Sequence, residues 1–530
     1  MPRVLESTLA LLQSRGITKI FGNPGSNEIP FLAGLAPDIE FVLGLHEQVV
    51  IGLAEGYSRA TGEVALVNLH AGAGSGNAMG ALTNAHYGHT PLVVLAGQQV
   101  RRTVGQEVML GNNDAALLPR PLVKYAHEPL AASDVPRALS QALLEAGTHP
   151  RGPVYVSVPL DDWGEAALES DVLLGRRTVT NHGGLSPETL AGLAADLNAA
   201  TRVALVLGPQ LDAAAVRDPQ VWAAVVTLAE RLNAAVFVAP SPDRSPFPTT
   251  HPNFEGVLVP GIRSVRDRLT GFDTVLALGT AVFRYHRWEP SSYLAPGVQV
   301  TQITEDPREA ARAPFGNAVI ADVGAATTQL AEMVTDRETR RGAPGSRALA
   351  DPEHSDDGFT GTELLALLNA HVNDAVVYVN ETTTLDLDYL EHVAIEHPGQ
   401  YHFPASGGLG FGLPVAVGLA LGDPGKTVVA TVGDGSANFG ISALYTAAEH
   451  QTRTVFIIVN NSGYGALAGF AARMGAANVP GLTLREIDFV SISQGYGVPA
   501  VRVTTAEAFA QAYREALHAD GPALIDARVV

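Results

Sequence analysis

An aspartate and an asparagine in the last third of the sequence have the types and spacing of a metal site. Asp434 lies in the stretch Gly433 to Ser436, and Asn461 follows 27 positions later (461 − 434) in the pair Asn460-Asn461. Carboxylate and amide oxygens are the ligands that a hard cation such as Mg²⁺ or Ca²⁺ prefers. A helix that begins beside them would favour a phosphate group. These residues therefore predict a site for a divalent cation and a phosphate.

Two buried strands and a helix between them would bring these residues together. Thr427 to Val432 and Thr454 to Val459 are runs of β-branched and apolar residues, and Ile441 to His450 has the pattern of a short amphipathic helix. A right-handed crossover makes the two strands parallel, so Asp434 and Asn461 leave the sheet at one carboxyl edge, where open α/β sheets bind ligands. A glycine-rich turn beside an incidental asparagine pair is the alternative interpretation.

Polar residues also follow strands near the N-terminus. Ser26 lies at the tip of a turn, Glu47 comes after the strand that ends at Leu43, and His70 comes after the strand Val64 to Leu69. Singly, they are explained by a turn, a carboxylate that caps a helix over 49–60, and a hydrogen-bonded strand-end histidine. Together they leave the carboxyl ends of strands in one block, which favours a shared site.

The glycine-rich stretch Ala71 to Asn77 follows His70 and is similar to a phosphate-binding loop. It lacks the Lys-Ser/Thr pair of a P-loop, so it is weak evidence for nucleotide binding.

The composition restricts the class of protein. With 530 residues the chain is too long for one core, and 46% hydrophobic against 17% charged residues is typical of a well-buried α/β enzyme. A net charge of −20 disfavours nucleic acid and anionic membranes as partners. The absence of cysteine excludes disulfides, thiolate catalysis and cysteine-ligated metals.

No targeting or membrane segment is expected. Met1 to Arg3 lead directly into an amphipathic helix pattern with Val4, Leu5, Leu9 and Leu12, and no signal peptide is recognisable. The most apolar long run, Gly407 to Gly422, is shorter than the roughly 20 residues that cross a membrane. We therefore expect a cytoplasmic enzyme.

The pattern of strands and helices predicts three blocks, at residues 1–180, 181–340 and 341–530. Expected strands are 39–43, 64–69, 92–96 and 154–158 in the first block and 202–207, 235–238, 274–278, 298–303 and 318–320 in the second. A polar linker is expected from Asp336 to about Gly358. Alternating strands and helices indicate an α/β fold of three doubly wound parallel sheets, each covered on both faces.

Longer stretches resemble a known family, the thiamine diphosphate-dependent 2-oxo acid decarboxylases and carboligases. The resemblance runs nearly end to end and is carried by 22–28, 76–82, 118–124, 282–286, 433–438, 464–467 and 478–482. Gly433 to Asn438 is common to the superfamily, whereas the trio Ser26, His70 and His286 is similar to members that act on benzoylformate.

The resemblance implies an aminopyrimidine-binding domain (1–180), a central domain (181–340) and a diphosphate- and metal-binding domain (341–530). It also implies that thiamine diphosphate is bound with Mg²⁺ or Ca²⁺, that Glu47 faces N1′ of the aminopyrimidine, and that two copies share each site in a dimer or tetramer. The implied metal ligands are Asp434, Asn461 and the carbonyl of Gly463, and the other implied cofactor contacts are Thr383, Gly407, Leu409, Gly435, Ser436 and Tyr464.

The implied reaction is non-oxidative decarboxylation of an aryl 2-oxo acid to the aldehyde and CO₂, with carboligation as a side activity, in aromatic catabolism. Ser26 would hold the substrate carboxylate, and His70 and His286 would act as general acid and base. The implied aryl pocket is apolar, and core packing is the alternative explanation for its members, which are Leu110, Phe403, Ala466, Leu467 and Phe470.

The chain departs from the family pattern at four places. Asp386 stands where a second threonine is usual, Gly469 where a tryptophan is, and Pro404 where a cysteine is. The first two could reshape the pocket and change the preferred 2-oxo acid. Ser462-Gly463 in place of Gly-Thr is harmless if the metal ligand there is a backbone carbonyl.

Other functions stay open. The chain could act on a different 2-oxo acid or be a carboligase. Pyruvate-type decarboxylases carry adjacent histidines, and this sequence has no His-His pair. Acetolactate synthases bind FAD and lack a histidine like His70, so FAD is not expected. Benzaldehyde lyase catalyses a related carboligation but lacks the arrangement of one serine and two histidines that Ser26, His70 and His286 form here. A non-catalytic cofactor-binding relative is disfavoured by the intact set of Glu47, Asp434, Asn461 and both histidines.

Overall fold

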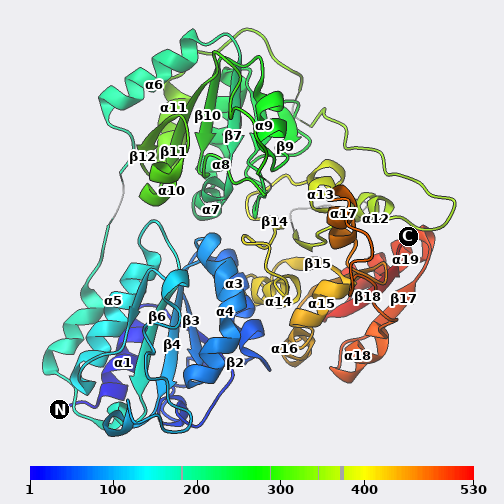
Figure 1. Cartoon of the computed structure of the whole chain (residues 1–530). Helices are drawn as coiled ribbons and strands as arrows, with labels where there is room; N and C mark the ends of the chain where they lie inside the picture. The colour runs from blue at the N-terminus through cyan, green and yellow to red at the C-terminus, as the bar shows by residue number, and fades with distance from the viewer. Residues whose placement is uncertain (181–182, 287, 344, 370–374) are drawn as a thin grey trace.

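Three parallel six-stranded sheets, each with helices on both faces, make up the chain (Figure 1). This computed structural model describes residues 1–180, 183–286, 288–343, 345–369 and 375–530. The predicted α/β class with three doubly wound sheets is confirmed. Each sheet and its helices are called the first, central and third domain below. The predicted boundary between 180 and 181 falls at residues outside the described part, and both boundaries stay predictions.

The first domain has the strand order β2-β1-β3-β4-β6-β5. The strands are β1 (Lys19–Gly22), β2 (Glu40–Leu43), β3 (Ala65–Leu69), β4 (Leu92–Gln98), β5 (Tyr125–His127) and β6 (Val154–Pro159). The α-helices are α1 (Val4–Ser14), α2 (Ile29–Leu32), α3 (Glu47–Thr61), α4 (Ala71–Tyr87) and α5 (Val135–Gly147). Short 3₁₀ segments are η1 (Arg101–Thr103), η2 (Arg120–Leu122), η3 (Ala132–Asp134), η4 (Asp162–Gly164) and η5 (Glu169–Arg176).

The central domain has the order β12-β11-β10-β7-β8-β9. The strands are β7 (Val203–Leu207), β8 (Ala235–Val238), β9 (Phe254–Val257), β10 (Thr274–Leu278), β11 (Gln299–Thr304) and β12 (Asn317–Ile320). The helices are α6 (Pro187–Ala199), α7 (Pro209–Arg217), α8 (Pro219–Arg231), α9 (Ile262–Leu269), α10 (Pro307–Arg312) and α11 (Val323–Met333).

The third domain has the order β14-β13-β15-β16-β18-β17. The strands are β13 (Val376–Glu381), β14 (Tyr401–His402), β15 (Thr427–Gly433), β16 (Thr454–Asn460), β17 (Ala500–Val503) and β18 (Ala523–Arg528). The helices are α12 (Gly361–Leu368), α13 (Asp386–His392), α14 (Gly412–Gly422), α15 (Asp434–Gly440), α16 (Ala443–Glu449), α17 (Gly465–Arg473), α18 (Phe489–Gly495) and α19 (Ala506–Leu517).

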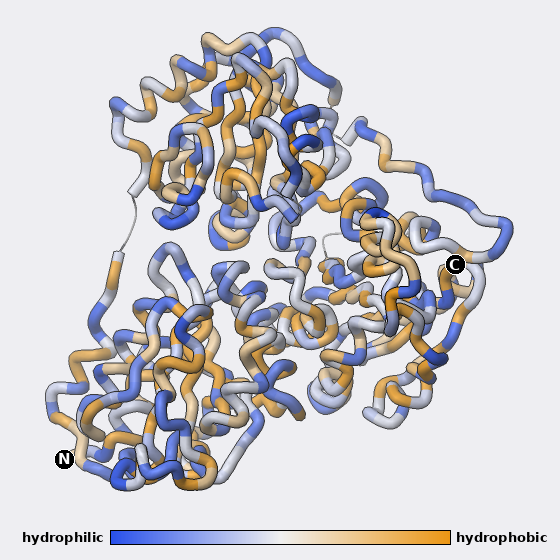
Figure 2. Tube along the Cα trace, in the orientation of Figure 1, coloured by the Kyte–Doolittle hydropathy of each residue, from blue (hydrophilic) through white to orange (hydrophobic). Residues whose placement is uncertain are grey.

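Strand residues alternate between two cores, one on each face of a sheet. In β16, Val455, Ile457 and Val459 join one hydrophobic cluster, whereas Phe456 and Ile458 join another. This is the expected period of two for a strand that is buried on both faces. Figure 2 shows the result as hydrophobic colour along the strands inside each domain. The sheets are therefore rigid supports for the loops at their carboxyl edges.

Helices α3 and α14 join the first and third domains by a close crossing. Added Cβ atoms on Gly56 and Gly418 would lie 2.1 Å from the carbonyl oxygen of Val415 and 2.0 Å from that of Leu53. Only glycine permits this approach of two backbones. The crossing places the first turn of α3, which begins at Glu47, beside the loop that leads into α14.

The helix expected over 441–450 is confirmed as α16 (Ala443–Glu449), and a further helix, α15, already begins at Asp434. Two other local predictions were wrong. Residues 71–77 are not a loop but the first two turns of α4. Glu47 does not precede its helix as a cap but is the first residue of α3, and the side chain of His46 caps that helix. In both cases the stretch follows a strand end closely, and helices start there.

The described parts of the segment from Asp336 to about Gly358 run along the outside of the molecule as the predicted polar linker, at the right of Figure 1.

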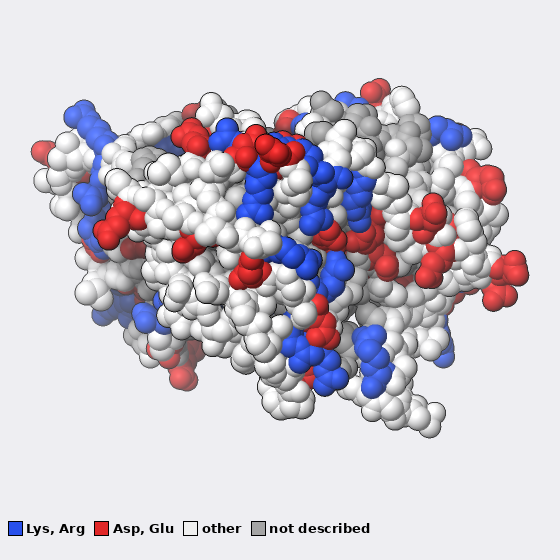
Figure 3. Space-filling model, turned by 90° about the horizontal axis from the view of Figure 1, so that it is seen from above, with Lys and Arg blue, Asp and Glu red and all other residues white. Residues whose placement is uncertain are grey.

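Among the described residues, no helix combines the length and apolar character needed to cross a membrane. The face in Figure 3 carries basic and acidic side chains close together, so the net negative charge does not form a single-sign surface there.

Candidate active site

A cavity of about 560 Å³ lies at the carboxyl edge of the third sheet. It contains seven of the predicted cofactor and metal residues, which are Thr383, Asp434, Gly435, Ser436, Asn461, Gly463 and Tyr464. Sequence reasoning did not identify its other lining residues, which are Gly361, Thr382, Thr384, Leu385, Gly433, Val459, Gly465, Val529 and Val530. All of them belong to the third domain.

The two predicted metal ligands converge because their strands are neighbours. β15 and β16 are parallel, with Gly433 opposite Val459, so Asp434 and Asn461 leave the sheet at the same level. The backbone N–H of Gly463 donates to Oδ2 of Asp434 at 3.1 Å and to Oδ1 of Asn461 at 3.2 Å. One carboxylate oxygen and one amide oxygen therefore accept from the same N–H group, so the two oxygen ligands that a hard cation prefers lie close together.

The environment of Asp434 is suited to a cation. Burial raises the pKa of this carboxyl group, and the N–H groups of Gly435 and Gly463 partly offset the effect by donating to it. Its side chain is only 3% exposed. A buried carboxylate is costly unless an opposite charge compensates it. The donor set of Asp434, Asn461 and nearby backbone oxygens therefore fits a divalent cation.

The loop 407–411 is held by a buried carboxylate that sequence reasoning did not identify. Glu381, at the end of β13, accepts from the N–H of Gly410 at 2.6 Å and from that of Gly412 at 2.5 Å. Burial raises the pKa of Glu381 to about 7. Gly407 has a left-handed backbone (φ 74°) and Leu409 follows it, so Glu381 fixes the shape of a loop that carries two predicted cofactor contacts. Its position at a strand end was the available signal.

Glu47 has polar contacts within the first domain. Its Oε2 accepts from Asn77 at 3.0 Å and its Oε1 from Asn23 at 3.4 Å. The carboxylate is 7% exposed and packs against Gly74, where a Cβ would lie 3.1 Å from Oε1. Both asparagines lie in or beside stretches that carry the sequence resemblance, but no role was predicted for them.

His70 and Ser26 lie on the same side of the first sheet. His70 precedes α4 at its N-cap position, and its Nδ1 is 2.9 Å from Oε2 of Glu28, which is 1% exposed. Burial raises the pKa of Glu28, and the hydrogen bond from His70 opposes that rise. A Cβ on Gly25 would lie 2.0 Å from Nδ1 of His70, so the turn that carries Ser26 rests on the imidazole ring.

The backbone of Leu110 contacts the turn that carries Ser26. Its carbonyl oxygen accepts from Nδ2 of Asn27 at 3.1 Å, and its side chain is 42% exposed. Ser26 is exposed beside it. The first domain thus presents Ser26, Glu47, His70 and Leu110 from the carboxyl edge of its sheet.

His286 lies with the predicted aryl pocket residues of the third domain. Its ring meets the ring of Phe470 edge-on, with centroids 5.0 Å apart. Phe470 shares helix α17 with Ala466 and Leu467, and the guanidinium of Arg473 lies 4.4 Å from the centre of its ring.

The carboxyl group of Asp386 is close enough to His286 to interact with it. Burial raises the pKa of Asp386, and the charge of His286 acts in the opposite direction. Phe403 is buried directly after β14. The structure therefore divides the predicted residues into the cation cavity, the Glu47 and His70 group of the first domain, and the His286 and Phe470 group.

The chain matches three sequence families along its length. All three are domains of thiamine pyrophosphate enzymes. Residues 3–117 match the N-terminal TPP binding domain, residues 190–330 match the central domain, and residues 382–527 match the C-terminal TPP binding domain.

Whole-length relatives were also found. The chain is 45% identical to benzoylformate decarboxylase of Pseudomonas aeruginosa, over 99% of this chain and 98% of that protein. Its fold matches the thiamine diphosphate-dependent 4-hydroxybenzoylformate decarboxylase of Rhodococcus jostii with a TM-score of 0.97 and 48% identity, over 100% and 99% of the two chains. Benzoylformate decarboxylase of Polynucleobacter necessarius matches with a TM-score of 0.95 and 34% identity, over 100% and 99%.

Proposed function

The chain belongs to the thiamine diphosphate-dependent enzymes, in the family of benzoylformate decarboxylase, and we propose that it converts an aryl 2-oxo acid to the aldehyde and CO₂. It is a thiamine diphosphate-dependent carbon–carbon lyase. The proposed substrate class depends mainly on one observation. Ser26, His70 and His286 are all present in a chain that is 45% identical to benzoylformate decarboxylase over 99% of its length. Benzoylformate or a ring-substituted relative is the proposed substrate, with carboligation as a side activity in aromatic catabolism.

The cofactor would be held by the cavity of the third domain. Asp434, Asn461 and the carbonyl of Gly463 would bind Mg²⁺ or Ca²⁺. Four further lining residues would contact the diphosphate, and these are Thr383, Gly435, Ser436 and Tyr464. Gly407 would offer its carbonyl to the aminopyrimidine, and Leu409 would support the bent cofactor. Thiamine diphosphate supplies an electron sink for the pair of electrons left by departing CO₂.

Glu47 would reach this cavity from a second copy of the chain. The cavity is lined by the third domain alone, whereas Glu47 makes its hydrogen bonds to Asn23 and Asn77 of the first domain. The first and third domains both expose large apolar side chains, which include Met109, Leu110, Leu117, Leu118, Phe439 and Leu467. Apolar surface of this kind marks an interface. A dimer that joins the two groups, and a tetramer built from two dimers, follow from this proposal.

The histidines would move protons at the reacting carbon. The hydrogen bond that Nδ1 of His70 donates to Glu28 would fix the ring and leave Nε2 to face the substrate. His286, held edge-on against Phe470, would act from the other side. Ser26, in the turn that rests on His70, would donate to the substrate carboxylate. Proton transfer by a positioned histidine typically contributes 10²- to 10⁴-fold, roughly, to the rate.

The substrate's ring would lie among Leu110, Phe403, Ala466, Leu467 and Phe470, of which Leu110 and Leu467 are 42% and 51% exposed. A second copy that covers these side chains would complete the apolar pocket. An alkyl 2-oxo acid would leave part of it unfilled and lose several kcal/mol, roughly, of burial. Asp386 and Gly469 favour the second candidate, a decarboxylase or carboligase for a different 2-oxo acid.

The test is release of CO₂ from benzoylformate by protein freed of cofactor and metal, before and after thiamine diphosphate and Mg²⁺ are restored. We expect activity only after both are present, with benzaldehyde formed in equal amount to CO₂. Full binding of thiamine diphosphate without release of CO₂ from any aryl 2-oxo acid would instead indicate a non-catalytic relative.

A further inference from the structure

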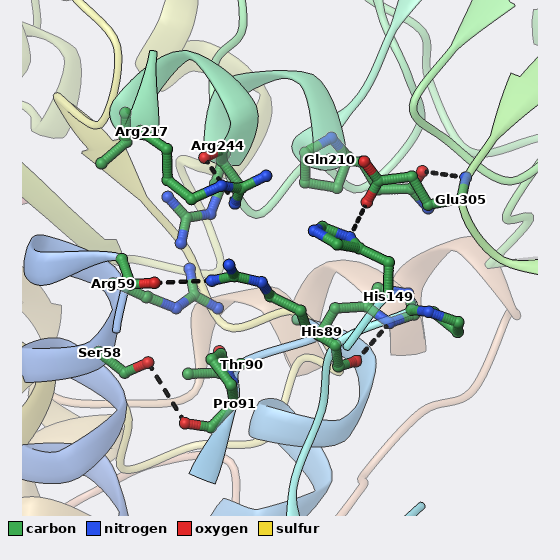
Figure 4. Close-up of a pocket in the computed structure, with 17 residues that line it drawn as sticks. Ser58, Arg59, His89, Thr90, Pro91, His149, Gln210, Arg217, Arg244 and Glu305 are labelled. Carbon is green, nitrogen blue, oxygen red and sulfur yellow. Dashed lines mark hydrogen bonds and ion pairs between the residues drawn. The ribbon is translucent and has the colours of Figure 1, made fainter. Parts of the chain in front are cut away.

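A second cavity lies between the first and central domains, away from the residues discussed so far (Figure 4). It encloses about 650 Å³, part of it open to solvent. On the central-domain side it is walled by Pro209 and Gln210, which follow β7, and by Glu305, which follows β11. The strand order changes direction between β7 and β10, and open α/β sheets bind ligands in the crevice at such a point.

Four arginines line this cavity, and two of them are neutralised. Nη2 of Arg59 donates to Glu55 at 2.8 Å and to Asp243 at 3.1 Å. Nη1 of Arg244 donates to Asp212 at 3.2 Å. Figure 4 shows the side chains of Arg59, Arg217 and Arg244 extending toward the same space.

The other two arginines, Arg151 and Arg217, donate to carbonyl groups. Nη1 of Arg151 donates to the carbonyl of Gly62 at 2.6 Å, and Nη1 of Arg217 to that of Ala213 at 3.0 Å. Nε of Arg151 is buried and has no hydrogen-bond partner among the described residues. Burial and the charge of Arg217 lower the pKa of Arg151 to about 10, although Glu63 and Glu305 oppose that effect. Two positive charges are therefore crowded together at this wall.

The acidic side chains of the opposite wall are engaged elsewhere. Glu305 forms an ion pair with Nδ1 of His149. Glu309, which does not line the cavity, lies 3.7 Å from Nε2 of His89 and accepts from Gln210 at 2.9 Å. Glu305 still attracts Arg151 from a distance, but among the described residues neither Arg151 nor Arg217 forms an ion pair with a carboxylate, so most of their charge is left for a ligand.

We propose that this cavity binds the phosphate group of a small phosphorylated metabolite, with Arg151 and Arg217 as its ligands. A phosphate dianion matches two guanidinium charges, and its oxygens accept the paired N–H groups of arginine and the unused Nε–H of Arg151. The remainder of the ligand would lie against the apolar lining, which includes Pro91, Pro150, Pro209, Ala213 and Val216. Because the cavity joins two domains, bound ligand stabilises their arrangement.

The experiment titrates inorganic phosphate into enzyme saturated with thiamine diphosphate and Mg²⁺, so that the diphosphate cavity is already filled. Calorimetry and thermal unfolding are measured at constant ionic strength, with acetate and chloride as comparison anions. We expect saturable binding of one phosphate per chain and a rise in Tm. Arg151→Gln and Arg217→Gln should each weaken binding at least about tenfold, because each removes a charge-assisted contact.

Arg514→Gln is the matched control, since Arg514 is an exposed residue of α19 in the third domain and its substitution removes the same charge. It should leave phosphate binding unchanged. Without phosphate, Arg217→Gln should be at least as stable as the wild type, because it relieves repulsion at Arg151; a purely structural arginine would lose stability. Arg217 is exposed, so this variant is informative even if Arg151→Gln fails to fold.

Absence of saturable binding at millimolar phosphate would overturn the proposal, and so would equal binding of acetate or unchanged binding by both arginine variants. Decarboxylation should persist in both variants, so failure here is distinguishable from failure of the proposed activity.

Discussion

At the scale of single residues, Glu47 and Asp434 are both buried carboxylates but have different proposed tasks. Glu47→Gln keeps the shape and the contacts to Asn23 and Asn77 but removes the charge that faces the aminopyrimidine. Turnover should fall by orders of magnitude while cofactor still binds. Asp434→Ala removes a metal ligand and its charge, so cofactor and metal affinity should fall.

Titration of thiamine diphosphate and Mg²⁺ against activity separates the two carboxylates. Excess cofactor and metal should restore Asp434→Ala in part but leave Glu47→Gln inactive. Near wild-type turnover by Glu47→Gln would show that its assigned role is wrong.

The polar residues proposed to face the substrate give a second prediction at this scale. His70→Ala and His286→Ala should each lower kcat on benzoylformate by roughly 10²-fold or more, the usual effect of losing a positioned acid or base. Ser26→Ala should mainly raise KM, since it removes a contact to the substrate carboxylate. Steady-state kinetics of the three variants test this, and unchanged kcat in either histidine variant would contradict the assignment.

At the scale of elements, Glu381 anchors the loop between β14 and α14 through the N–H groups of Gly410 and Gly412. Its pKa of about 7 lies above the ordinary value of 4.5 because of burial. The folded state therefore binds a proton more tightly than the unfolded state. The corresponding stability is complete below pH 4.5 and is lost as the pH rises to about 7.

The loss amounts to about 3 kcal/mol. Glu381→Gln cannot titrate, so its unfolding free energy should fall less than that of the wild type between pH 5 and pH 7.5, about the range of the shift. Thermal unfolding across this pH range checks the prediction, and identical pH profiles would refute it.

The elements also show what the sequence could predict. The runs 427–432 and 454–459 are strands, because apolar β-branched runs buried on both faces have few alternatives. Parallel pairing then placed Asp434 beside Asn461. Glu28 and Glu381 were not identified, because their importance comes from burial and from partners 42 and 29 residues away in the chain. Helix starts at Ala71 and Asp434 were missed, because glycines in these stretches lower helix propensity and tertiary packing overrides it.

At the scale of the whole molecule, the separation of the cation cavity from the Glu47 group leads to a prediction about assembly. We expect a dimer at minimum at working concentration in analytical ultracentrifugation. When Glu47→Gln and Asp434→Ala chains are mixed and reassociated, mixed dimers contain one site with both carboxylates intact. At a cofactor concentration that leaves each parent inactive, activity should therefore recover in the mixture.

Recovery should approach about a quarter of the wild-type value, because half of the dimers are mixed and half of their sites are intact. Two copies of the same variant, reassociated alone, are the control and should stay inactive. An active monomer, or a complete lack of recovery from subunits shown to exchange, would contradict a site shared between copies.

The ratio of kcat/KM for benzoylformate to kcat/KM for pyruvate, measured on the cofactor-saturated enzyme, tests the central claim most directly. An apolar pocket that holds a phenyl ring gains several kcal/mol, roughly, over one that holds a methyl group, so benzoylformate should be favoured by at least about 10²-fold. A ratio near or below one would contradict the aryl assignment and leave a thiamine diphosphate-dependent decarboxylase of short 2-oxo acids, with Asp386 and Gly469 as the residues that changed its pocket.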